Sequence, residues 1–276
     1  MSTKMLTYTN LDSPIHRLNG VTKLIFFVVW SVTAMITYDT RCLLGMLILG
    51  LLALKISRVA FRQYAFVLGF IAVFFLLNEI AVFLFSPMQG TELYGTRHDL
   101  VHLAGRYTLT WEQLFYQFNI ALKYAVVIPM ALLFLLTTDP SEFAASLNRV
   151  GASYKLAYSV SIALRYLPDI QQDYHNISFS AQARGIDMSR KEKLSRRLKN
   201  AVSILIPLIL TSVDRIDRIS AAMELRGFGR KGKRTWYKTR PFTGMDYTAL
   251  AILSAIVVAS FSLTFSDGSR FYNIFQ

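Results

Sequence analysis

The sequence has few of the residues from which most metal centres and disulfide frameworks are built. Only one of its 276 residues is a cysteine, Cys42, and only four are histidines. A single cysteine excludes an internal disulfide framework and any cysteine-based structural zinc site. Charged residues are also scarce, at 17%, whereas a soluble domain has about 25%. This composition argues against a soluble enzyme.

Hydrophobic residues are abundant, and the charge that is present is strongly positive. Hydrophobic residues make up 53% of the chain, the mean hydropathy is +0.38, and the formal net charge is +13. An integral membrane protein with a concentrated basic region satisfies both observations.

Four apolar runs could cross a bilayer, namely residues 21–38, 64–85, 113–138 and 247–265, and a fifth, 42–54, could by its length alone be a buried or re-entrant helix. A span needs about 20 mostly apolar residues, so the run 42–54 is short. We count it as a span because the charge pattern requires it. The sequence therefore predicts an all-α, polytopic membrane protein with about five transmembrane helices.

The distribution of charge predicts the topology. Residues 184–240 contain 16 Lys and Arg against five Asp and Glu, a net charge of +11, and the short segment 55–62 is basic as well. Cytoplasmic loops collect Lys and Arg, which places the N-terminus and residues 139–245 in the cytoplasm and the C-terminal tail outside. We expect a membrane part at 1–138, a cytoplasmic coupling-helix region at 139–245 and a last span with an external tail at 246–276.

The long segment 139–245 has helical periodicity but no globular pattern. One helix is predicted up to Gly151, and a second is bent or restarted at Pro168. A basic piece at 190–199, an apolar piece interrupted at Pro207 and a polar helix from Asp214 are predicted to follow. The apolar pieces are too short to span, so we expect helices that lie along the inner membrane face and cover one another.

Two polar helical stretches of this segment end in the same Arg-Gly pair. Glycine is the usual residue after a helix C-terminus, and arginine there favours the helix dipole, so either pair alone is explained by capping. The two pairs lie 42 residues apart on the predicted cytoplasmic side, and an arginine at a helix end suits carboxylates on a partner. They predict two docking points for a two-lobed or dimeric partner, built from Ala183, Arg184, Gly185, Glu224, Arg226 and Gly227.

Three groups of residues together resemble the T component of the energy-coupling factor (ECF) transporters, the EcfT/CbiQ-like family. Residues 13–18 and 22–24 resemble the family's opening pattern, residues 164–168 (Leu-Arg-Tyr-Leu-Pro) resemble a central element, and the two Arg-Gly ends resemble its signature. The chain departs at 19–21, where a Pro-Arg pair is commoner, and at Leu225, where alanine is usual.

The resemblance implies a membrane scaffold whose coupling helices hold two ATP-binding-cassette ATPases and whose membrane part holds a substrate-binding S component. Arg184 and Arg226 would each enter a groove on one ATPase. The expected role is uptake of a vitamin, a vitamin precursor, or nickel or cobalt ions across a bacterial or archaeal cell membrane. The scaffold itself would be non-catalytic and without cofactors, because ATP and magnesium are bound by the ATPases.

The residues themselves also argue that energy comes from a partner. Residues 227–233 have the glycine and lysine spacing of a phosphate-binding P-loop, but Arg234 occupies the position of the magnesium-binding Ser or Thr. No strand precedes them, so no nucleotide site is predicted.

Other ionisable residues leave several interpretations open. His98 and His102 have a spacing that could bind a metal on one helical turn, but a solvated external loop at residues 86–112 explains them more simply, and no metal site is predicted. Glu79 and Lys123, inside predicted spans, could pair with each other, line the S-component contact or serve a proton relay. The basic segment is interpreted as an inner-leaflet lipid contact rather than a nucleic-acid site.

Two other classes of function stay open at this stage. A self-sufficient secondary transporter or channel would transport without ATPases, and it does not account for a long cytoplasmic insert with two helix ends. A membrane-embedded enzyme would need His, Asp, Glu or Ser residues converging at one interface, and no such set is visible in the sequence.

Overall fold

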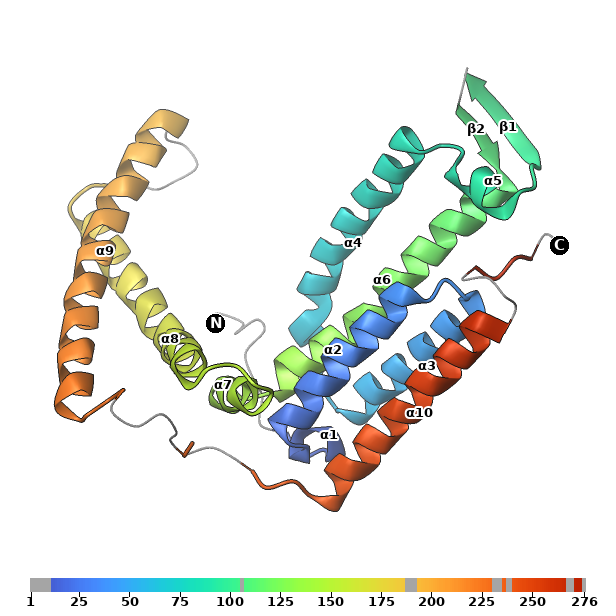
Figure 1. The fold of residues 1–276 in the computed structure, drawn as a ribbon. Helices are drawn as coiled ribbons and strands as arrows, with labels where there is room; N and C mark the ends of the chain where they lie inside the picture. Colours follow the sequence, from blue (N-terminus) through green and yellow to red (C-terminus); the bar gives the residue numbers. More distant parts are fainter. Residues whose placement is uncertain are drawn as a thin grey trace. The chain divides into compact units, whose positions relative to one another are not determined.

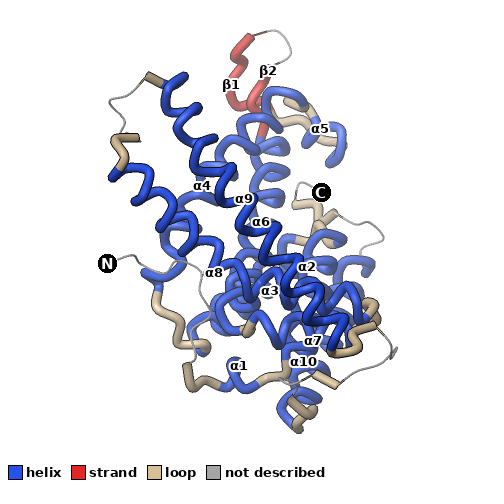
Figure 2. The backbone as a smooth tube through the Cα atoms, turned by 90° about the vertical axis from the view of Figure 1, so that its left-hand side faces the viewer, coloured by secondary structure: helices blue, strands red, loops and turns tan. Residues whose placement is uncertain are grey.

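The computed structural model describes residues 11–104, 107–186, 193–229, 235–236, 240–266 and 271–274. Helices dominate the described backbone, with one hairpin of two antiparallel strands between α5 and α6 (Figures 1 and 2). The prediction of an all-α membrane protein is confirmed. In chain order the elements are α1 Pro14–Arg17, α2 Gly20–Ile36, α3 Thr40–Ile56, α4 Phe61–Phe85, α5 Gln89–Tyr94, β1 Asp99–Ala104, β2 Tyr107–Thr110, α6 Trp111–Thr137, α7 Pro140–Arg149, α8 Tyr154–Ala183, α9 Leu194–Leu225 and α10 Gly244–Ser266.

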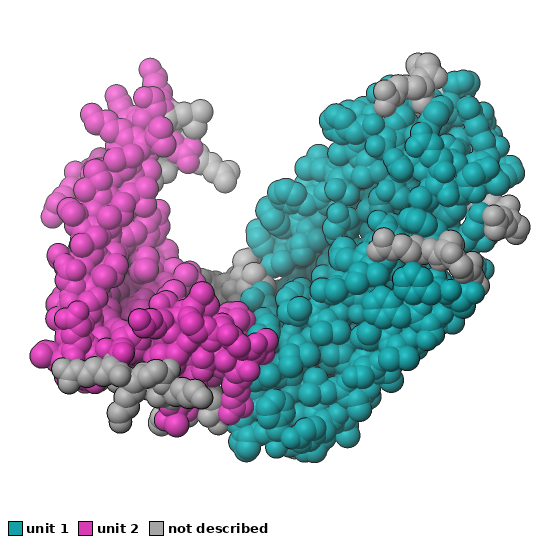
Figure 3. Space-filling model, in the orientation of Figure 1, with its two compact units in different colours: residues 1–139, 240–276 teal, residues 140–239 magenta. Residues whose placement is uncertain are grey.

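The chain forms two compact units (Figure 3). Unit 1 comprises Met1–Asp139 and Arg240–Gln276, and unit 2 comprises Pro140–Thr239. The chain therefore leaves unit 1 once, after α6, and returns to it once, before α10.

The core of unit 1 is built around α6. This helix packs against α2, α3 and α5, and α10 packs against α2 and α3. The indole N–H of Trp30, which is 1% exposed, donates to the Val126 carbonyl at 3.1 Å, so the ring joins α2 to α6. Other buried members of this cluster are Ala34, Leu43, Met46, Leu122, Met130, Leu133 and Leu253.

Polar side chains fix where the helices of unit 1 begin. Asn19, Asp39 and Thr110 precede α2, α3 and α6, and the side-chain oxygen of each accepts a backbone N–H two or three residues further on. Such N-caps satisfy groups that an isolated helix end would leave unbonded, so each of these helices starts at a defined residue.

Three helices of the described part are long and apolar enough to cross a membrane: α4, α6 and α10, with 25, 27 and 23 residues. They contain most of the predicted spans 64–85, 113–138 and 247–265. The helices α2 and α3 have 17 residues each. At about 1.5 Å per residue they are shorter than the roughly 30 Å hydrocarbon core. The total of five spans therefore stays a prediction.

Two expectations about local structure were wrong in detail. Residues 86–112, expected as a loop, contain α5 and the β1–β2 hairpin. The pieces expected around Pro207 are one continuous helix, α9. Of the two alternatives for Pro168, a restart is excluded because this proline lies inside the continuous helix α8, whereas a bend is compatible with it. An interior proline removes one hydrogen bond and bends a helix, but the flanking turns continue here because α8 and α9 pack against each other.

Candidate functional site

The two Arg-Gly pairs have the same backbone geometry at the ends of α8 and α9. Arg184 and Arg226 are the C-cap residues. In each case the glycine N–H donates to the carbonyl three residues earlier, at 2.9 Å. The next N–H donates to the carbonyl five residues earlier, at 3.1 Å for α8 and 2.9 Å for α9. These two hydrogen bonds together form the Schellman motif, which ends a helix at a defined residue.

Glycine is required at both positions by backbone conformation. Gly185 has φ +84° and Gly227 has φ +66°, in the left-handed region that other residues adopt only at a cost. The chain therefore turns sharply directly after each arginine. The predicted glycine C-caps are confirmed.

The side chains at both helix ends face solvent within unit 2. Ala183, Arg184, Glu224 and Arg226 are all exposed. Within the described residues, the guanidinium groups of Arg184 and Arg226 have no hydrogen bond or ion pair. We refer to Ala183–Gly185 as the first tip and to Glu224–Gly227 as the second tip. Each presents an unneutralised fork of N–H donors, which suits a carboxylate from another molecule.

An ion pair joins the two helices at equivalent positions. Arg215 of α9 binds Asp173 of α8, and both side chains are partly buried, with exposures of 28% and 29%. Asp173 precedes Arg184 by eleven residues, and Arg215 precedes Arg226 by the same number. At about 1.5 Å per residue each tip lies roughly 16 Å along its own helix from the crossing point. The ring of Tyr166, from the Leu-Arg-Tyr-Leu-Pro element, lies 5.9 Å from the Arg215 guanidinium carbon.

Aromatic side chains hold the chain that follows the second tip. The ring of Phe228 lies 4.7 Å from that of Tyr158 and 5.9 Å from that of Tyr154, both in the first turns of α8. Trp236 packs on Tyr154 at 5.6 Å, and its indole N–H donates to Asn148 at 3.2 Å. The end of α9 is thereby fixed to the start of α8.

The sequence interpretation missed these supporting residues. Asp173 and Arg215 share the 42-residue offset of the tips, and that offset could have identified them. The aromatic cluster has no such signal, because it joins residues from α8 and from the segment after α9.

The ionisable residues inside the predicted spans do not pair with each other. The Lys123 ammonium donates to the Met35 carbonyl at 2.8 Å and lies 3.0 Å from the centroid of the Tyr38 ring. It therefore neutralises the C-terminal end of α2. The Glu79 atom Oε1 is buried and has no hydrogen-bond partner among the described residues.

The two histidines of segment 86–112 are engaged locally. His98 Nδ1 lies 2.6 Å from the buried Glu112 carboxylate, and His102 Nδ1 lies 3.0 Å from the Thr108 hydroxyl. His102 lies in strand β1, so the two histidines do not share the helical turn that the metal-binding alternative required, and this part of the expected loop is a strand. No group of three or more potential metal ligands occurs in the described part of the chain. Most of the P-loop-like stretch, at 230–234, lies outside the described residues.

Comparison with known proteins gives a consistent picture. The family model of CbiQ, cobalt transport protein, matches residues 12–236. The energy-coupling factor transporter transmembrane protein EcfT of Bacillus selenitireducens is 29% identical over 269 residues, covering 95% of this chain and 97% of that protein. The EcfT protein of Bacillus subtilis is 28% identical, and the match covers 92% of this chain and 94% of that protein. The EcfT protein of Staphylococcus aureus is 23% identical, and the match covers 94% of this chain and 96% of that protein.

Proposed function

From the premise that the chain belongs to the CbiQ family and is the transmembrane component of an energy-coupling factor transporter, we propose that it couples two cytoplasmic ATPases to an S component. The ATPases bind ATP and magnesium, and this chain transmits their movement without catalysing a reaction. The S component binds a micronutrient: a vitamin, a vitamin precursor, or nickel or cobalt ions.

The observation that carries the proposal is the equivalence of the two tips. Two helices with the same terminal geometry and the same eleven-residue distance from a shared ion pair would suit two similar sites on a pair of ATPases. Arg184 and Arg226 each insert a guanidinium against acidic groups of one ATPase, while Ala183 and Glu224 lie at the rim. Movement of the two ATPases toward each other then moves the two tips and changes the crossing of α8 and α9.

Exposed apolar side chains support contacts of the coupling helices with the S component and with lipid. On α8 and α9, Leu167, Ile209 and Ile216 are each more than half exposed. Apolar patches of this kind are covered by a partner or a membrane.

A second surface of the same character lies in unit 1. A cavity of about 580 Å³ between α4 and α6 is lined mainly by apolar side chains, with Asn78 among them. Because both helices are long and apolar enough to cross a membrane, this surface would suit a membrane-embedded contact with the S component.

The test is charge reversal at both tips. Arg184→Glu combined with Arg226→Glu is expected to abolish co-purification with both ATPases, because each tip would then repel the acidic site. The protein should still insert and show only a slightly lower melting temperature, since neither guanidinium has an intramolecular partner among the described residues and the reversal loses only the interaction with the helix dipoles. A matched control reverses two other exposed cations of α9, Lys199→Glu with Arg218→Glu, and should keep both ATPases.

Retained co-purification after the double tip reversal would contradict the assignment of the tips. Substrate uptake in vesicles that lack the ATPases would instead favour a self-sufficient secondary transporter or channel.

A further inference from the structure

The N-terminal segment 13–23 is a buried polar cluster whose role the docking tips do not explain. Ser13, His16, Asn19, Thr22 and Lys23 are between 0% and 6% exposed. Polar groups are buried at a cost unless they are hydrogen-bonded, so the partners of this cluster indicate what it holds.

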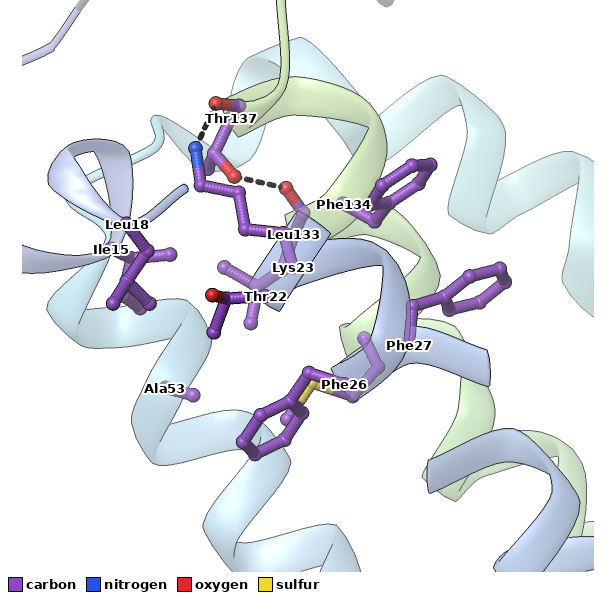
Figure 4. A pocket seen from close by; sticks show the side chains of 11 residues that line it. Ile15, Leu18, Thr22, Lys23, Phe26, Phe27, Ala53, Leu133, Phe134 and Thr137 are labelled. Atoms are coloured by element: carbon purple, nitrogen blue, oxygen red, sulfur yellow. Dashed lines mark hydrogen bonds between the residues drawn. The ribbon is translucent and has the colours of Figure 1, made fainter. Parts of the chain in front are cut away.

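One partner of the cluster is Thr137, close to where the chain leaves unit 1. The Lys23 ammonium donates to the carbonyl of Thr137 at 2.7 Å (Figure 4). It also lies 3.4 Å from the carbonyl of His16. Thr137 is the last residue of α6, and unit 2 begins three residues later, at Pro140. The ammonium therefore fixes the outgoing connection to the start of α2.

A second partner is the point where the chain returns to unit 1, at Arg240. The Asn19 side-chain amide donates to the Arg240 carbonyl at 2.6 Å. The Arg240 guanidinium in turn donates to the His16 carbonyl at 3.1 Å. The His16 carbonyl thus accepts from both Lys23 and Arg240, which brings both connections to one place.

The carboxylate of Asp246 completes the cluster at the start of α10. It is fully buried and accepts from the backbone N–H of Asn19 at 2.8 Å and from the Thr22 hydroxyl at 2.9 Å. It also accepts from the backbone N–H and the hydroxyl of Thr243, both at 2.8 Å. Four donors to one buried carboxylate make a rigid junction between α2 and α10.

We infer that this cluster, the connection clamp (His16, Asn19, Lys23, Arg240 and Asp246), holds Thr137 and Arg240, the two ends of unit 1 to which the connections attach, in one rigid block with the starts of α2 and α10, so that a movement arriving through either connection moves these helices together. The inference rests on the proposed function. Hydrogen bonds that tie Thr137 and Arg240 to the start of α2 limit separate movement of these two ends within unit 1. Asn19, Lys23 and Asp246 are positioning residues.

A purely structural role accounts poorly for the lysine. Its partners are main-chain carbonyls, and Thr137 is 114 residues away in sequence. A methionine would fill a similar volume beside the apolar cavity of about 140 Å³ that Ile15, Leu18 and Phe26 line, without the cost of burying an ammonium group.

The test compares three variants of the full chain in lipid nanodiscs. Lys23→Met removes the donor to Thr137, and Lys23→Arg keeps a cation. Asn19→Ser retains a helix-capping oxygen but cannot reach Arg240, so it disrupts only the return connection and is the milder change. Arg17→Gln is the matched control, because Arg17 lies in the same segment and pairs with Asp12 at the surface.

The first measurement needs no partner protein. Spin labels are placed at two exposed residues of unit 1, Leu135 near the end of α6 and Tyr247 near the start of α10, and the distribution of distances between them is recorded. Lys23→Met and Asn19→Ser should broaden it, whereas Lys23→Arg and Arg17→Gln should leave it as in the unmodified chain. Unchanged widths in both disruptive variants overturn the inference.

The second measurement uses the assembled transporter in vesicles. The two disruptive variants should keep ATP hydrolysis and ATPase association but lower the substrate transported per ATP by about fivefold or more, the low end of a typical coupling energy. An unchanged ratio, with or without broadened distances, overturns the inference. Failure of the unmodified chain to bind ATPases would count against the proposed function instead, and the spin-label measurement would still decide on the clamp.

Discussion

Replacing Gly185 by alanine tests whether the fixed geometry of the first tip is what the ATPase recognises. Gly185 has φ +84°, and a Cβ atom built on it would meet no atom within 4 Å. The substitution therefore introduces no steric clash and leaves the charge of Arg184 in place. Its effect comes only from the backbone conformation.

The expected magnitude follows from that conformation. An alanine in the left-handed region costs about 1–2 kcal/mol relative to its preferred conformations, so the chain after Arg184 adopts other directions for most of the time. Because apparent affinity falls with the fraction of competent conformation, binding at this tip should weaken about five- to thirtyfold.

The assay is a titration of the nanodisc-embedded chain with the purified ATPase pair. Gly95→Ala is the matched control, because Gly95 ends α5 with φ +70° and likewise has no atom within 4 Å of a built Cβ. It should cause a similar loss of local stability without weakening ATPase binding. Equal affinities for Gly185→Ala and the unmodified chain, or an equal loss in the Gly95 control, would refute the reasoning.

Three further substitutions follow from the contacts described above. Asp173→Arg should weaken ATPase binding about fivefold by breaking the crossing ion pair, a modest value because the pair is partly exposed, and adding Arg215→Asp should restore binding. Lys123→Met should lower the unfolding free energy by about 1–2 kcal/mol in a thermal melt, because the hydrogen bond from the ammonium to the Met35 carbonyl is lost. The pH profile of transport should not change, and an altered profile would favour a proton relay. Gly90→Ala should destabilise unit 1 by about 1–3 kcal/mol or more, because its Cβ would lie 2.4 Å from the carbonyl oxygen of Glu112, and a native melting temperature would contradict this.

The sequence alone located much of the secondary structure that matters here. The runs 64–85, 113–138 and 247–265 lie almost entirely within α4, α6 and α10, because the length of an apolar run is a local property that a bilayer requires. The two tips were also identified, since glycine after a helix end satisfies a local backbone requirement. The prolines were less informative, because neighbouring helices decide whether a bend ends a helix.

Only the tertiary structure decided which polar side chains meet. Asp173 and Arg215 are 42 residues apart, Lys23 and the Thr137 carbonyl are 114 apart, and Asn19 and Asp246 are 227 apart. A buried polar group needs a hydrogen-bond partner, and this much follows from the residue type. Which group becomes the partner depends on how the helices pack. For the same reason Lys123 binds a helix end rather than Glu79.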